Sequence, residues 1–304
     1  MSTPVPDITL NEYAKGLFQQ NASPLADMLA PIVPTGAAQF SIIDYAKRSS
    51  FQAPDAKRAI GGGSTAVQTD GEKLKISLDP YALHDDIDKH ELHLAGDEGA
   101  KALLRQARVQ NLVSQAGNSR LKEVLATLRA GVTASPESWA PSEDPVNDID
   151  GYMETISNKI GMAPNYAVFS LGAWRIFKNH SSVKARLTSG NTKTKDAVVK
   201  LEDVGSLFLN PNTQCAVSTT VSDAKMNAAE SKANVLGAEV WVYYREESAN
   251  QFDASAFKTF RISENPFDGV RVLQKDFGER PTVEWTEAAF VNNADAAERL
   301  TVTA

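Results

Sequence analysis

Apolar residues recur at helical spacing between Asp97 and Gly131, a stretch that contains no proline. It is rich in Ala, Leu, Lys, Arg, Gln and Glu, the residues that favour helices. Asp97 is suited to cap the start of a helix, and Gly131 to follow its end. We predict one helix of roughly 50 Å, at 1.5 Å per residue. The alternative is two helices with a break near Gly117 and Asn118.

The apolar side of this predicted helix changes along its length. Three groups follow one another on different sides: Ala100, Leu103, Leu104 and Ala107; then Val109, Leu112, Val113 and Ala116; then Leu121, Val124, Leu125 and Leu128. One partner surface cannot cover all three groups. We therefore expect a spine that is shared between its own domain and neighbouring subunits, and we expect an Asp at Leu104 to abolish folding.

Alternating residues predict strands before this helix. Leu74, Ile76 and Leu78 alternate with polar residues, and Phe40 and Ile42 begin an earlier strand. The intervening segment contains three consecutive glycines and two basic pairs, one of them Lys57 with Arg58. Long loops of this kind are uncommon in compact domains and are usually functional. We predict a projecting hairpin that meets a neighbour through Lys57, Arg58 and Ile60.

Residues 1–39 are interrupted by prolines and predict an arm with one short amphipathic piece at 11–20. The arm carries many apolar side chains, among them Phe18 and Leu29. Such a surface does not remain free in water. We expect the arm to lie on another subunit or on its own body.

A second unit is predicted after the long helix, because the segment 134–150 is rich in Pro, Ser and acidic residues. Its pattern predicts a helix over 150–160, a strand over 166–170, a helix around Trp174 and an exposed loop over 184–200. Strands are predicted over 206–209, 214–221 and 239–244, and alternation returns between Phe260 and Trp285. Mixed elements of this order indicate an α+β fold.

The composition is that of an ordinary globular protein. The chain has 304 residues, is 42% hydrophobic and has a net charge of −7, which argues against a broad surface for phosphate backbones. It has no apolar run long enough for a membrane span and no basic start followed by an apolar block. Its single cysteine, Cys215, excludes an internal disulfide and is expected to be a packed residue.

Potential metal ligands are densest between His84 and His93. The cluster consists of His84, Asp85, Asp86, Asp88, His90, Glu91 and His93. Its spacing matches no known metal motif, so we interpret it as an acidic connector, and a metal-dependent enzyme is the alternative. Asp85, Asp86 and Asp88 are also predicted to meet Lys57 and Arg58 of a neighbour.

No other catalytic or cofactor motif is supported. The segment Gly61–Ala66 formally matches a dinucleotide fingerprint, but a strand pattern follows it where a helix is required. The sequence contains neither a phosphate-binding P-loop nor a G-x-S-x-G nucleophile motif. We therefore predict no catalytic residue, no cofactor and no enzymatic activity.

Three segments together resemble the major capsid protein of tailed bacteriophages, with the Hong Kong 97-type fold. They are GGGSTAVQTDGEKLKISLDPYALHDDID, IGMAPNYAVFSLGAWRIFKNHSSVKARL and VEWTEAAFVNNADAAERL. The resemblance is one of order and residue type and covers nearly the whole chain. It implies an N-terminal arm over 1–39, an extended loop over 40–84, a peripheral domain with the spine helix over 85–142, an axial domain over 143–248, and a return to the peripheral domain over 249–304.

The resemblance also implies a function. Proteins of this family form hexamers and pentamers that close an icosahedral shell around double-stranded DNA, so the expected location is the virion, after assembly in the host cytoplasm. No long charged helical segment precedes the arm, so we expect a separate scaffolding protein, or a scaffold segment that has already been removed. A portal is also expected as a partner. An encapsulin-type nanocompartment shell, which shares the fold, is the nearest alternative.

Overall fold

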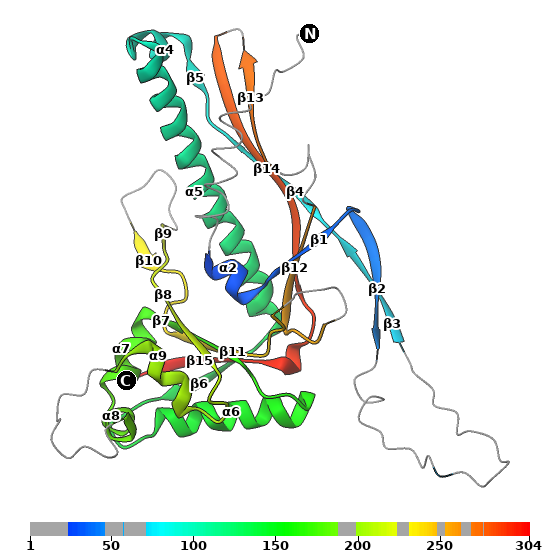
Figure 1. Ribbon diagram of the computed structural model, residues 1–304, viewed down its shortest axis with the longest axis vertical. Helices are drawn as coiled ribbons and strands as arrows, with labels where there is room; N and C mark the ends of the chain where they lie inside the picture. Colours follow the sequence, from blue (N-terminus) through cyan, green and yellow to red (C-terminus); the bar gives the residue numbers. More distant parts are fainter. Residues whose placement is uncertain are drawn as a thin grey trace.

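The computed structural model describes residues 24–45, 57, 71–187, 199–223, 231–247, 253–262, 269–275 and 277–304. A long helix, α5, runs beside a long strand, β14, and reaches a second body of sheet and helices at its lower end (Figure 1). Two sheets, one on each body, therefore share one helix. No helix among the described residues is long and apolar enough to cross a membrane.

The predicted long helix is confirmed as α5, Glu98–Gly131, which continues without a break through Gly117. The Asp97 side chain accepts a hydrogen bond from the Ala100 amide at 2.7 Å and caps the helix as predicted. Gly131 does not follow the helix but is its last residue, and Val132 leaves it in extended conformation. A Cβ at Gly131 would lie 2.6 Å from Cγ2 of Val291, so glycine permits the close approach of β14.

The first sheet has six strands in the order β1-β12-β14-β13, and β4 and β5 also pair with β14. Their bounds are β1 Ile32–Thr35, β4 Asp79–His84, β5 Ile87–Asp88, β12 Phe257–Ile262, β13 Gly269–Lys275 and β14 Gly278–Val291. Because β14 has 14 residues, it follows α5 over much of the helix and pairs with four other strands. It is the centre of this sheet.

The middle group of α5 packs on this sheet. Val109, Leu112, Val113 and Ala116 are at most 3% exposed and form one cluster with Val283, Trp285, Tyr81 and Leu83. Full cover of this group within one subunit contradicts the expectation that α5 is a spine shared with neighbouring subunits. Its own sheet covers it, because β14 and β4 extend along α5 well beyond the main core.

The second sheet has five strands in the order β6-β15-β11-β7-β8. Their bounds are β6 Ala134–Ser138, β7 Tyr166–Ser170, β8 Gln214–Ser218, β11 Glu239–Tyr243 and β15 Ala297–Thr303. The associated helices are α6 Pro145–Ile160, α7 Leu171–Asn179, α8 Ser181–Leu187 and α9 Leu201–Val204. A short ribbon, β9 Val221–Asp223 with β10 Lys232–Asn234, adjoins β8.

Helix α6 begins earlier than the predicted 150–160 segment, because Pro145 occupies its first turn, where a missing amide is tolerated. It ends at Ile160, and Gly161 follows as its C-cap with a φ of 72°, which suits glycine. The predicted strand over 166–170 is confirmed as β7. Residues 184–187, predicted as loop, are helical in α8, and residues 205–207 form a 3₁₀ turn where a strand was predicted.

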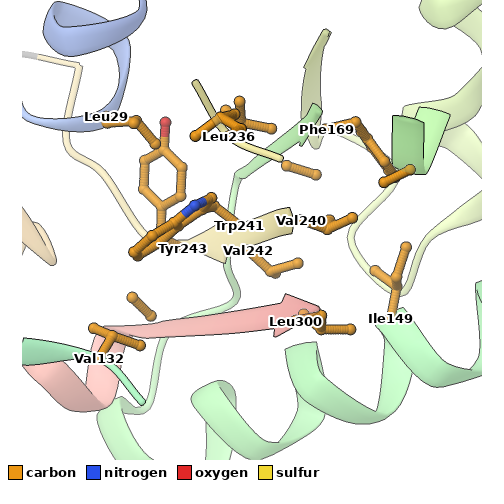
Figure 2. Close-up of a cluster of buried hydrophobic side chains, with 14 of the residues drawn as sticks. Leu29, Val132, Ile149, Phe169, Leu236, Val240, Trp241, Val242, Tyr243 and Leu300 are labelled. Atoms are coloured by element: carbon orange, nitrogen blue, oxygen red, sulfur yellow. The ribbon is translucent and has the colours of Figure 1, made fainter. Parts of the chain in front are cut away.

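The main core surrounds β11, whose Val240, Trp241, Val242 and Tyr243 are fully buried. Figure 2 shows these side chains between Leu300 of β15, Ile149 of α6 and Leu29 of α2, the helix Pro24–Leu29. The third group of α5 joins this core: Leu121, Val124, Leu125 and Leu128. Helix α5 thus contributes its middle to one core and its lower half to another.

Strand pairing crosses two of the predicted domain boundaries. β15 belongs to the segment 249–304 but pairs with β11 and β6 in the five-stranded sheet, not with β12, β13 or β14. β4 belongs to the segment 40–84 and pairs with β14. The division into arm, extended loop, peripheral domain and axial domain stays a prediction.

Candidate subunit interface

The first turns of α5 present an apolar face that points away from β14. Leu103 is 67% exposed, Ala107 is exposed, and Ala100 and Leu104 are half-buried. The expectation that Leu104 lies in a buried face is therefore wrong, because this group occupies the side of α5 opposite the sheet. Further along the same side, the exposed residues are all polar: Asn111, Ser114, Gln115 and Asn118.

Two further exposed apolar side chains lie at the same end of the molecule. Leu94 is 73% exposed at the end of α4, Lys89–Leu94, and Phe277 is 81% exposed directly before β14. The Lys89 amide donates a hydrogen bond of 2.9 Å to the Phe277 carbonyl, which ties the two elements together. Figure 1 shows α4, the start of α5 and the start of β14 at the top of the view. We call Leu94, Leu103 and Phe277 the apolar tip.

Charged side chains around the apolar tip are paired within the chain. Arg105 binds both carboxylate oxygens of Glu279, at 2.7 and 2.8 Å. Arg108 bonds to Glu91 and to Asp85, and the hydrogen bond with Glu91 raises the pKa of Arg108. A partner surface can therefore cover the apolar tip without leaving these charges unpaired, and an unpaired buried charge would be strongly destabilising.

The predicted hairpin is formed by β2, Gln39–Tyr45, and β3, Gly71–Ser77. Within the described residues these strands pair only with each other, and they stand away from the main body in Figure 1. Ile42, Ile76 and Leu78 pack on Phe260 and Ile262 of the six-stranded sheet. An isolated two-stranded hairpin is marginally stable, so this anchoring allows it to project.

A buried charged junction lies where α5 crosses β14, and sequence reasoning missed it. The Arg120 side chain is 0% exposed, and its Nε donates to both oxygens of Glu287 at 2.9 and 3.0 Å. Its Nη1 lies 2.7 Å from Oδ1 of Asp27, and Arg261 Nη1 lies 3.9 Å from Glu287 Oε2. Burial raises the pKa of Glu287, whereas the two arginines oppose that shift. The sequence contained one indication of this junction. Arg120 follows Ala116 by four positions, which places this cation on the same buried side of the helix.

Solved structures with a similar arrangement are shell proteins and a phage-related protein. The phage-related protein from Bordetella bronchiseptica RB50 matches with a TM-score of 0.70 at 18% identity, over 98% of each chain. The capsid of cyanophage P-SCSP1u matches with a TM-score of 0.54 at 12% identity, over 90% of this chain and 86% of that chain. The chain has the Hong Kong 97-type capsid fold.

An encapsulin has the same capsid fold. The holo encapsulin complex from Synechococcus elongatus PCC 7942 matches with a TM-score of 0.54 at 11% identity, over 99% of this chain and 91% of that chain. No family model and no curated protein matches the sequence. The capsid fold is thus common to a phage capsid and an encapsulin, and it does not by itself choose between them.

Each of the three acidic residues that were predicted to contact a neighbouring subunit has a partner within its own chain. Asp85 binds Arg108, Asp86 accepts hydrogen bonds from Nε and Nη2 of Arg280, and Asp88 caps α4 by accepting a bond from the His90 amide at 2.7 Å. Contact of Asp85, Asp86 and Asp88 with a neighbour stays a prediction.

The remaining predicted contact residues have different outcomes. Leu29 is 0% exposed in the main core of its own subunit, so its expected contact with a neighbour is wrong. The arm was expected to lie on another subunit or on its own body, and the part that contains Leu29 lies on its own body. Lys57 is exposed. Phe18, Arg58 and Ile60 lie outside the described residues.

The cluster from His84 to His93 does not form a metal site in the part of the chain that the structure describes. No group of three or more His, Cys, Asp or Glu side chains there is arranged to hold an ion. The acidic members instead bind arginines or cap α4. Cys215 is half-buried, and burial raises the pKa of its thiol to about 12, so it is mostly protonated near neutral pH.

Proposed function

We propose that this chain is the major capsid protein of a tailed bacteriophage. It is a structural, non-enzymatic subunit that self-assembles as hexamers and pentamers into an icosahedral shell around double-stranded DNA. The observation that carries the proposal is the apolar tip: its three side chains are 67–81% exposed on a body with the capsid fold. Cover by a neighbouring subunit would remove the apolar surface of these side chains from water, which favours association.

The proposal includes a setting for assembly. The shell forms in the cytoplasm of a bacterial host with a separate scaffolding protein and a portal, and it becomes part of the virion. Packaged DNA is held by non-specific contacts, which suits a chain with a net charge of −7. The protein has no cofactor.

An encapsulin-type shell is the second candidate, because an encapsulin matches over 99% of the chain. Electron microscopy of purified protein should show closed shells or capsomers in either case. Analysis of shells from infected or expressing cells separates the two: DNA indicates a phage capsid, and a packaged protein indicates an encapsulin. A protein that stays monomeric at every salt concentration and with every scaffold tested would argue against both.

Substitution of Leu103 by Asp should prevent shell assembly and leave the subunit folded. Leu103 is already 67% exposed, so a carboxylate there costs the fold little. In a dry contact the same carboxylate would be buried without a partner, at a cost of several kcal/mol per subunit in order of magnitude. Sedimentation velocity should show subunits or capsomers in place of shells, with circular dichroism unchanged.

Ser114→Asp is the matched control for this substitution. Ser114 is exposed on the same side of α5, 11 residues further along, where the surface is polar. This variant should form shells at the level of the unchanged protein. If Leu103→Asp and Ser114→Asp assemble equally well, the apolar tip is not part of the interface.

Charge reversal at Lys57 and Arg58 should also impair assembly. Lys57 is exposed, and the pair belongs to the hairpin segment predicted to meet a neighbour. The double substitution Lys57→Glu with Arg58→Glu is expected to lower the yield of shells while the melting temperature of the subunit stays within a few degrees, as for most surface substitutions. Unfolding of the isolated subunit would show that this segment is part of the core.

A further inference from the structure

One side of the first turns of α5 is open to a partner. Gly99, Leu103 and Ala107 follow one another at intervals of four residues, and all three are exposed. Residues at this spacing lie one above another on the same side of a helix. Figure 1 shows this upper part of α5 at the left edge of the molecule, with β14 on its other side. We call Gly99, Leu103 and Ala107 the Leu103 face.

The charged side chains of this part of α5 point away from the Leu103 face. Residues 99–110 contain three charged side chains, and all three are cations: Lys101, Arg105 and Arg108. At about 100° per residue they lie roughly 140–160° round the helix from Leu103. Each binds carboxylates of its own chain, namely Glu98 for Lys101, Glu279 for Arg105, and Asp85 with Glu91 for Arg108. The Leu103 face is therefore uncharged.

The lack of charge decides which partner fits the Leu103 face. A nucleic acid or an acidic protein surface is bound through cations, and the cations here are turned away and paired. A surface that meets its own copy has a different requirement. In a two-fold contact a residue beside the axis faces the same residue of the second copy, so a charge there would face a like charge. An uncharged apolar face meets this requirement.

The shape of the Leu103 face also suits a contact with itself. Leu103 is its one large side chain, and Gly99 and Ala107 lie about one turn to either side. The distance between packed helices depends on the side chains at the contact, so small residues beside the leucine allow a close approach. Two copies of α5 that cross at Leu103 can therefore remove both leucines from water.

We propose that the Leu103 face of α5 binds the same face of a second copy of this chain, across a two-fold axis beside Leu103. This contact rests on the proposed shell function and gives the apolar tip its partner. A two-fold contact joins a pair, whereas a ring of five or six subunits requires head-to-tail contacts. The Leu103 face therefore joins one hexamer or pentamer to the next.

The contact is too small to hold two free subunits together. One exposed leucine with small neighbours on each copy offers far less than the roughly 1,200 Å² that stable interfaces bury. It contributes to a shell because many copies of the contact form at once. Isolated subunits should therefore not dimerise through α5, and Leu103→Asp should accumulate hexamers and pentamers in place of shells.

Two substitutions of opposite charge test the contact on the full-length chain. Leu103→Lys and Leu103→Glu each place like charges beside the axis, so neither variant alone should form shells. Because Leu103 is 67% exposed, both variants should fold, with unchanged circular dichroism. An equimolar mixture brings an ammonium and a carboxylate together across the axis, and it should restore the shells seen by electron microscopy.

Ser114→Lys and Ser114→Glu are the matched controls. Ser114 is exposed 11 residues further along α5, where two helices that cross at Leu103 have diverged. These variants should form shells separately and together.

The outcomes separate the two-fold contact from the shell function. The contact is overturned if the mixture of Leu103 variants stops at capsomers, because the apolar tip then meets a different surface. It is also overturned if each Leu103 variant forms shells alone, because like charges then do not meet. Absence of shells from the unchanged protein refutes the proposed function itself.

Cross-linking tests the same contact without adding a charge. A short bismaleimide should link Leu103→Cys to its own copy in assembled shells and give a dimer on a denaturing gel. Ser114→Cys and the unchanged chain should give no dimer, since Cys215 is half-buried and burial raises the pKa of its thiol to about 12. Shells of Leu103→Cys that yield only monomer on the gel would contradict the two-fold contact.

Discussion

Substitution of Val113 by Asp is expected to leave no folded subunit. Val113 is 1% exposed and packs with Val283 and Trp285 of β14. An unpaired carboxylate in this position loses its water and gains no cation, a cost of several kcal/mol in order of magnitude, which is comparable to the whole stability of a typical domain. The protein should be insoluble or should show no cooperative thermal transition.

Three aspartate variants of α5 separate folding from assembly when they are compared. Val113→Asp and Ser114→Asp differ by one residue along the helix, and only the first side chain faces β14. The second should fold and assemble, whereas Leu103→Asp should fold and not assemble. A soluble Val113→Asp subunit with an unchanged melting temperature would contradict the packing of α5 on β14.

Local patterns predicted the elements of this fold because local residues decide them. The absence of proline and the Asp97 cap fix α5 as one helix, and the apolar runs of β7 and β11 reflect strands that are buried on both faces. The end of α5 could not be predicted in the same way. Gly131 is the last helical residue, and Val291, 160 positions away, leaves no room there for a Cβ, so this glycine reflects a tertiary contact and not the end of the helix.

The partners of each apolar face were not predictable from local patterns. The three groups of α5 were identified correctly as facing different ways, but only the pairing of β14 with β4 shows that the middle group is covered by its own sheet. The partners of the charged side chains were not predictable from local patterns either. Arg108 and Arg280 bind Asp85 and Asp86 across the tertiary structure, and a sequence shows these carboxylates only as an acidic run.

The apolar tip was missed for a related reason. Leu103 belongs to an amphipathic pattern, and such a pattern normally marks a buried face. Its exposure follows from the position of β14 on the opposite side of α5, which is a property of the whole sheet. An apolar stripe therefore indicates that a partner exists, and the fold decides whether that partner belongs to the same chain.

Substitution of Trp285 by Ala is expected to destabilise the body formed by α5 and β14 by about 3–5 kcal/mol. Trp285 is 2% exposed, and its ring stacks on Tyr81 with centroids 5.3 Å apart. The cluster around it is separate from the main core. Amides of the middle of α5, such as that of Val113, should therefore exchange about 100-fold faster or more, while the Val242 amide of β11 changes less.

Trp139→Ala is the matched substitution in the main core, where Trp139 is also 2% exposed and packs on Phe177. It should lower the free energy of unfolding by a similar amount, but it should speed exchange of the Val242 amide more than that of the Val113 amide. The two variants together test whether one helix joins two separately packed bodies. If each substitution speeds exchange equally at both amides, the chain unfolds as a single unit, and the two clusters are not independent. If the effects stay apart, α5 connects two bodies that can loosen one at a time.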